Sequence, residues 1–337
     1  MVILFLVGAL IGYFVVNILL GIIVYISGKL MGHVLRECTI FGVRITKIKG
    51  KLSASASTFS PTVSVTMVRK DDDPVPEDPV SCEFKSSCSL IVLALIINGA
   101  VAAAGVLLAA KYTEAKPLVN GFLIMLGLWT LIIISTCIDT IIKLKGNSEK
   151  AVAFRESIIV RNKWMQGVRP RDIEVLYNED KVYSPQANIY LFYVQNLYYH
   201  LLDKGDFYYI ERLLPYFQKK TEYFAPANVI YYFELLYYYS IMSAMGNKEC
   251  NFKAYELYSR CQQSLENDND VNARRVLSAF KLYVANEPES ALELATEGLK
   301  NADDFNCSGL VAMEKELLEN IIKSAQFELA RTRGENI

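Results

Sequence analysis

Residues 2–26 read VILFLVGALIGYFVVNILLGIIVYI and contain no charged side chain. An apolar helix of about 20 residues crosses the roughly 30 Å hydrocarbon core of a bilayer. No basic segment precedes this run, and it is too long for the core of a cleavable signal peptide. We therefore expect it to stay in the chain as a membrane anchor.

Two further stretches have the same character, at residues 89–110 and 119–143. The first is free of charge, and Asp139 is the only charged residue among residues 119–142. Over all 337 residues, 52% are apolar and the mean hydropathy is +0.21, which is high for a soluble protein. The sequence therefore predicts three membrane spans, at about residues 2–27, 89–110 and 119–143. A lipid bilayer is accordingly an expected partner of the chain.

The charges indicate an orientation and exclude one class of partner. Lys29, Arg36, Arg44, Lys47, Lys49 and Lys51 follow the first span and are opposed only by Glu37, which favours a cytoplasmic loop. The N-terminus then lies outside the cell, and residues from 146 onward are cytoplasmic in a multi-pass protein of the cell membrane.

Basic and acidic residues nearly balance, 35 against 36, so we expect no nucleic-acid partner.

The loop at residues 36–70 has the pattern of strands. Phe41, Val43 and Ile45, and then Val63, Val65 and Met67, alternate with polar residues. A period of two predicts a small β-hairpin or sheet. Residues 71–85 follow as an expected acidic, proline-rich linker, and the whole of 1–145 forms a transmembrane module.

The sequence pattern of residues 184–332 predicts paired helices. Residues 146–183, which precede them, are expected to form connecting helices. Turn residues at 205–206, 246–247 and 286–289 separate apolar helical segments and recur about every 41 residues. A last helix at 308–329 would cap the array. The fold class is therefore mainly α: a three-helix transmembrane module with a small β insertion, and then a cytoplasmic α-solenoid of about three repeats that resembles tetratricopeptide repeats.

Tyrosine is concentrated in these helices, where 17 of the 21 tyrosines lie between Tyr177 and Tyr258. Tyrosine can fill helix–helix contacts or form a binding surface. Neighbouring residues of a helix point to different faces. We therefore expect some of the following clustered tyrosines to lie on an outer face, as candidate partner-binding residues: Tyr231, Tyr232, Tyr237, Tyr238 and Tyr239.

The metal-binding residue types are few. Seven cysteines occur without a C-x-x-C pair, and we expect them to be free thiols. The two histidines, His33 and His200, are too far apart for a helical H-E-x-x-H zinc site.

Lys29, His33 and Asp139 lie within or beside the spans, where charged groups are costly and are functional candidates. The predicted topology places His33 and Asp139 at a similar depth. They could be metal ligands, a proton-relay pair or interfacial residues.

Lys29-Leu30-Met31-Gly32-His33, followed by residues 39–45 (TIFGVRI), resembles a segment of a known family. It is similar to the H-E-L-G-H segment and following strand of the site-2 protease class of intramembrane zinc metallopeptidases, in bacterial members with a cytoplasmic helical-repeat tail. In that class two histidines and a distal aspartate bind zinc, and the glutamate is the general base. The resemblance implies that His33 matches the second histidine and Asp139 the distal aspartate.

The motif is degenerate at its two other positions, because Lys29 replaces the first histidine and Leu30 the glutamate. An ammonium group repels zinc, and leucine cannot accept a proton from bound water. We therefore expect no catalytic residue and no cofactor, and Lys29 could instead supply positive charge to Asp139.

The expected function is that of a catalytically inactive, site-2-protease-like protein that presents a helical-repeat domain to an unidentified protein or peptide. The alternative is a metallopeptidase with a rearranged site, which uses His33 and Asp139, with Cys38 or Cys137, as zinc ligands. A transporter is less favoured, because three spans offer no inverted repeat.

Overall fold

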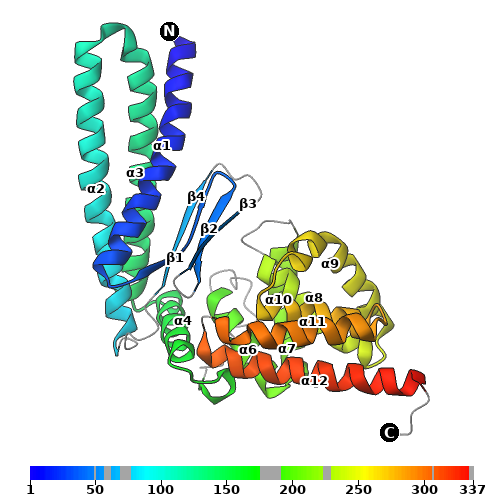
Figure 1. Ribbon diagram of the computed structural model, residues 1–337. Helices are drawn as coiled ribbons and strands as arrows, with labels where there is room; N and C mark the ends of the chain where they lie inside the picture. The colour runs from blue at the N-terminus through cyan, green and yellow to red at the C-terminus, as the bar shows by residue number, and fades with distance from the viewer. Residues whose placement is uncertain are drawn as a thin grey trace. The chain divides into compact units, whose positions relative to one another are not determined.

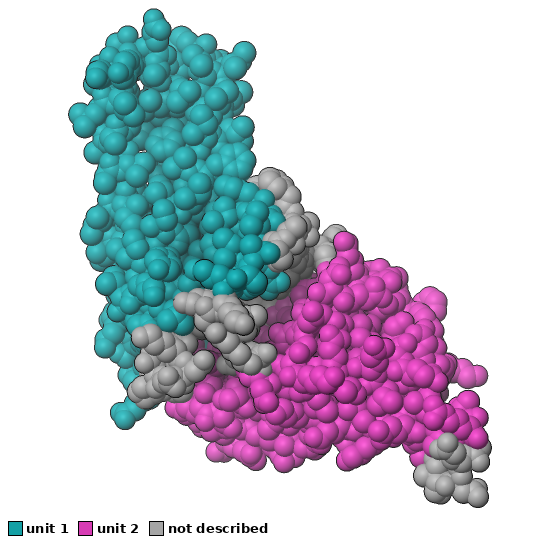
Figure 2. Space-filling model, in the orientation of Figure 1, with its two compact units in different colours: residues 1–155 teal, residues 156–337 magenta. Residues whose placement is uncertain are grey.

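The structure is a computed structural model that describes residues 1–48, 51–56, 62–68, 77–174, 191–222, 229–305 and 307–333. The chain divides into two compact units, Met1–Arg155 and Glu156–Ile337 (Figure 2). The described residues are mainly helical, with one small antiparallel sheet, as predicted.

Three long helices dominate the first unit: α1 (Val2–Leu30), α2 (Pro79–Lys111) and α3 (Lys116–Lys145). They pack against one another, and the short helix η1 (Thr113–Ala115) joins α2 to α3 (Figure 1). All three, with η1 included in the third, are long and apolar enough to span a membrane, which confirms this part of the sequence prediction.

The second long helix starts earlier than expected. Residues 79–85, assigned to the linker from sequence, form the first two turns of α2. The start has two local causes: the Asp78 carboxylate accepts a hydrogen bond from the Ser81 N–H at 2.9 Å, and Pro79 occupies the first helical position. Residues 71–76 of the expected linker lie outside the described part of the chain.

Small and polar residues hold the three helices together. The Asn98 amide donates to the Thr130 hydroxyl at 2.8 Å between α2 and α3. Gly8 of α1 lies against the backbone of Leu118 in α3, so closely that an added Cβ would lie 1.9 Å from the Leu118 carbonyl oxygen. Such close backbone approach is typical of helix pairs in membranes.

The sheet lies between α1 and α2 in the sequence and has four strands: β1 (Val34–Ile40), β2 (Val43–Ile48), β3 (Lys51–Ala56) and β4 (Val63–Val68). All pairs are antiparallel, in the order β3-β2-β1-β4. Phe41, expected in a strand, instead lies in the β1–β2 turn with a φ of +47°. Val63 and Met67 of β4 contact α1 at Gly21 and Gly28.

The described part of residues 146–183 contains α4 (Glu149–Met165) and the short helix η2 (Pro170–Asp172). Residues 175–183 of the segment expected to hold connecting helices lie outside the described residues. In the second unit, Val160 and Trp164 of α4 are buried, and the Trp164 ring packs edge-on against Tyr199 of α6 (Leu191–Lys204).

Helices continue to the end of the second unit: α7 (Phe207–Thr221), α8 (Val229–Ala244), α9 (Lys248–Glu266), α10 (Val271–Tyr283), α11 (Pro288–Asn301), η5 (Ala302–Asp304) and α12 (Ser308–Arg333). The turns at 205–206 and 246–247 fall where the sequence placed them. Consecutive helices from α6 to α12 pack together, and α10 also contacts α8 and α12 (Figure 1).

Candidate functional site

The segment that resembles a zinc motif forms the end of helix α1. The last helical residue is Leu30, and Gly32 takes a φ of +82°. The His33 N–H donates to the Gly28 carbonyl at 2.8 Å, and the Gly32 N–H donates to the Lys29 carbonyl at 3.1 Å. This is a Schellman motif, which ends a helix at a left-handed residue, usually glycine. His33 therefore lies outside the helix that a zinc motif of this type requires.

The other two candidate residues of this region, Lys29 and Asp139, have different surroundings. Lys29 is exposed, with its Nζ atom 5.9 Å from the centre of the Tyr25 ring. Asp139 forms an ion pair with Lys143 of the same helix, and its side chain is 60% exposed. The structure thus pairs Asp139 with Lys143, one turn away on α3, and not with Lys29.

The residues considered as zinc ligands have other neighbours in the structure. Within the described ranges, no three histidine, cysteine, aspartate or glutamate side chains come close enough to hold a metal ion. Cys137 instead packs with the apolar residues Ile23, Ala94 and Ile133, and Cys38 sits in β1 opposite Ile45 and Val65. All seven cysteines are free thiols, as predicted.

The clustered tyrosines are not on the surface. Tyr231, Tyr232, Tyr237, Tyr238 and Tyr239 are all buried, so the expectation that some face outward is wrong. The reason is that α8 contacts α7, α9 and α10, and ten consecutive residues of it are buried. A helix that is enclosed in this way is apolar or aromatic on all faces. These tyrosines form the core of the second unit and cannot contact a partner in this state.

A buried charge cluster lies at the centre of the same helices. The Arg275 guanidinium of α10 is 0% exposed and donates to Glu234 of α8 at 2.9 Å and to Glu314 of α12 at 2.7 Å. It also lies 4.2 Å from the centre of the Tyr237 ring. The Tyr199 hydroxyl of α6 donates to Glu234 at 3.0 Å. The cluster thus joins four helices, α6, α8, α10 and α12.

Two carboxylates share one guanidinium in this cluster, so it is electrostatically unbalanced. Burial, reinforced by the charge of Glu234, raises the pKa of Glu314, although Arg275 opposes the shift. Burial likewise raises the pKa of Tyr237 well above its ordinary value. One amino group of Arg275, Nη1, has no hydrogen-bond partner among the described residues. The cluster is enclosed and its groups are mostly paired with one another, which is typical of a structural core.

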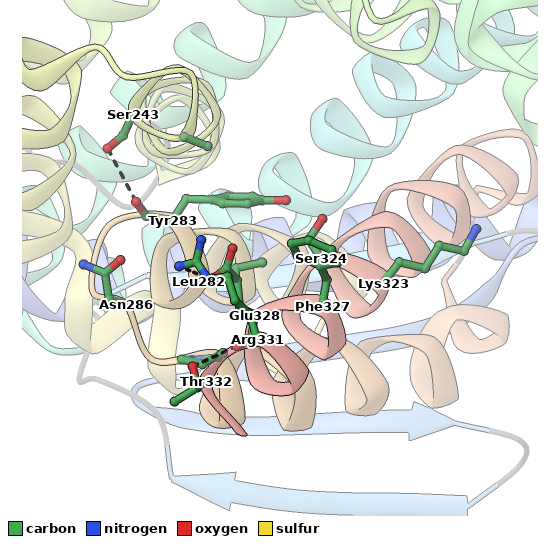
Figure 3. Close-up of a pocket in the computed structure, with 12 residues that line it drawn as sticks. Ser243, Leu282, Tyr283, Asn286, Lys323, Ser324, Phe327, Glu328, Arg331 and Thr332 are labelled. Carbon is green, nitrogen blue, oxygen red and sulfur yellow. Dashed lines mark hydrogen bonds and ion pairs between the residues drawn. The ribbon is translucent and has the colours of Figure 1, made fainter. Parts of the chain in front are cut away.

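The second unit contains an open groove of about 740 Å³ (Figure 3). Leu282 and Tyr283 at the end of α10 line it, together with Asn286 and Pro288 of the following turn and helix. Ser243 and Ala244 of α8 border one side, and the last three turns of α12 border the other. The Ser243 hydroxyl donates to the Tyr283 carbonyl at 3.5 Å, which ties one wall to the floor (Figure 3).

Large apolar side chains stand exposed next to this groove. Phe327 of α12 lines the groove itself and is 50% exposed. Met245 directly follows the lining residue Ala244 and is 63% exposed, and Phe252 of α9 is 72% exposed. The Asn251 amide, one residue before Phe252, donates to the Ser243 hydroxyl at 2.9 Å, which holds the first turn of α9 close to the groove. Aromatic residues and methionine in such settings are typical of protein–protein interfaces.

No family model, curated protein or solved structure matches this chain. Among the described residues that line the groove there is no histidine or cysteine, and the carboxylate of Glu328 is paired with Arg331 at 2.7 Å.

Sequence reasoning missed both the groove and the charge cluster. The groove combines residues from four helices, and no local pattern brings 243–244, 282–288 and 323–332 together. The charge cluster had a weak signal, because Arg274-Arg275 lies in a helical segment whose other residues are mostly apolar. Phe252 and Met245, next to the turn at 246–247, could have been noted as large apolar residues at a polar turn.

Proposed function

We propose that this chain is a membrane-anchored interaction protein that binds another protein through its second unit. The observation that carries the proposal is the 740 Å³ groove with Phe327 exposed in its wall, together with the exposed Met245 and Phe252 near the turn that joins α8 to α9. Exposed apolar patches on a folded unit mark interaction sites. The helices α1, α2 and α3 would hold this unit at a membrane surface.

The proposal includes an orientation and a type of array. The basic residues after α1 favour a cytoplasmic position for the second unit, with the N-terminus outside. The packing of α10 against α8 and α12 as well as against its sequence neighbours supports a short α-solenoid that resembles tetratricopeptide repeats. Such arrays commonly act as binding surfaces.

We further propose that the chain lacks the peptidase activity of the site-2 protease class, which its first unit resembles in sequence. Three features support this loss: Lys29 and Leu30 at the positions of a ligand and a base, the helix end before His33, and the ion pair of Asp139 with Lys143. None of these groups can activate a water molecule in the way that the class requires.

Crosslinking in native membranes tests the interaction. We expect the full-length chain to capture a partner that is lost from Met245→Ser/Phe252→Ser, because these substitutions remove exposed apolar contact area. Tyr208→Ser is the matched control, since Tyr208 is an aromatic residue of α7 that is 64% exposed and does not line the groove. Equal capture by all three proteins, or none by the parent chain, would contradict the proposal.

A zinc and cleavage assay tests the loss of activity. The purified chain in lipid nanodiscs should hold zinc far below one ion per chain and should not cleave a membrane-embedded reporter peptide. His33→Ala should change neither result. Stoichiometric zinc that is lost in His33→Ala, together with cleavage blocked by a chelator, would instead establish the metallopeptidase that uses His33 and Asp139.

A further inference from the structure

The groove differs in charge from the unit that contains it. Residues 156–337 contain 20 basic and 26 acidic residues, so the second unit is negative overall. The charged residues that line the groove are Lys323, Glu328 and Arg331, which gives an excess of one positive charge. Since Glu328 is already paired with Arg331, no described acidic side chain of the groove forms an ion pair with Lys323. A ligand with negative charge would complement this site.

The floor and one wall provide an apolar subsite. Pro288 contributes aliphatic surface above the mostly buried Leu282 of the floor, and the half-exposed Phe327 ring adds an aromatic wall. One large apolar side chain inserted here would cover surface that now faces water. The burial of a leucine or phenylalanine side chain contributes about 1.5–3 kcal/mol, and such anchors dominate the energetics of interfaces.

Hydrogen-bonding side chains line the rest of the groove. The Tyr283 ring extends from α10 toward Ser324 of α12, and Asn286 lies at the turn beyond α10 (Figure 3). An extended peptide carries unpaired backbone N–H and C=O groups that need such partners, whereas a helix pairs its own. The exposed side chains beside the groove extend the surface beyond what a small molecule would cover.

We propose that this groove binds an extended, acidic peptide segment of a partner protein, with one large apolar residue seated between Pro288 and Phe327. The inference rests on the proposed function, because it names the class of partner that the second unit binds. Negative side chains of the peptide lie toward Lys323, and its backbone pairs with Asn286, Tyr283 and Ser324.

Peptide selection provides the test. The full-length chain in lipid nanodiscs is panned against a phage-displayed library of random dodecapeptides, with empty nanodiscs for counter-selection. We expect enriched peptides with a leucine, phenylalanine or methionine flanked by aspartate or glutamate. Their affinity, measured by fluorescence anisotropy, should fall by about tenfold in Lys323→Glu and again in Phe327→Ser.

Two matched controls isolate the groove. Lys300→Glu makes the same charge change near the end of α11, and Tyr208→Ser removes an aromatic residue of α7; neither residue lines the groove. Both should bind the selected peptides as the parent chain does.

The outcomes separate this inference from the proposed function. A basic consensus, an apolar spacing typical of an amphipathic helix, or no enrichment would overturn the peptide assignment, and crosslinking would still decide whether the unit binds a protein. If acidic peptides bind Lys323→Glu and Phe327→Ser with the same affinity as the parent chain, the binding site lies outside the groove and the peptide assignment is wrong. The proposed function would not be affected by that result.

Discussion

Replacing Arg275 by methionine is expected to destabilise the second unit by about 3–5 kcal/mol, because it leaves two buried carboxylates without a counter-charge. Glu234 and Glu314 are 2% and 1% exposed at their side chains, so water cannot compensate for the loss. The change also removes the cation that lies over the Tyr237 ring. Since four helices meet at this cluster, the whole unit should unfold at lower denaturant concentration.

Urea unfolding of the detergent-solubilised chain measures this loss through the fluorescence of Trp164, in a Trp129→Phe background that leaves one indole. Arg260→Met is the control, since Arg260 is exposed and pairs with Glu256 within one helix, an interaction worth about 0.5 kcal/mol or less. Adding Glu234→Gln and Glu314→Gln to Arg275→Met should restore part of the stability. If Arg275→Met unfolds like the control, the cluster is not the electrostatic centre that its geometry indicates.

Substituting Gly8 by alanine is expected to force α1 away from α3. The new Cβ would lie 1.9 Å from the Leu118 carbonyl oxygen, and backbone atoms cannot move aside as a flexible side chain can. The contact is reciprocal, because a Cβ on Gly121 of α3 would lie 2.1 Å from the Phe5 carbonyl oxygen. Overpacking of this kind costs about 1–3 kcal/mol or more.

Thermal unfolding in detergent should show a lower midpoint for Gly8→Ala than for the parent chain. Gly127→Ala on α3 and Gly99→Ala on α2 are the matched controls, since nothing lies within 4 Å of a Cβ at either position. Alanine is the better helix former, so the controls should be neutral or slightly stabilised. The double variant Gly8→Ala/Gly121→Ala should cost less than the sum of its parts, because one displacement relieves both clashes. A Gly8→Ala midpoint equal to that of the controls would contradict the close packing.

The long apolar helices could be predicted because composition alone decides them. A charge-free run such as residues 2–26 has few alternatives to a buried or spanning helix. The sheet could be predicted from its alternation, but not its order β3-β2-β1-β4, since β1 pairs with β4 across more than twenty residues. The predicted helix boundaries were wrong where a capping residue sets the start of the helix, as Asp78 does for α2.

The tyrosines of α8 show why a correct local rule can give a wrong site. The rule that Tyr231 and Tyr232 point to different faces holds, but it places a residue outside only if the helix has an outer face. Because α8 is covered by α7, α9 and α10, every face is an inner one. The number of neighbours of a helix is a property of the tertiary structure and cannot be read from a local sequence pattern. The groove beside Phe327 could not be predicted for the same reason.

The position of β4 along α1 has a consequence for the depth of the sheet. Val63 contacts α1 at Gly21, nine residues before the helix ends at Leu30, or about 14 Å along its axis. A lipid layer that covers the full length of α1 therefore also surrounds the Val63 end of this strand. There the free edge of β4 would have to find its hydrogen-bond partners in protein, since hydrocarbon offers none.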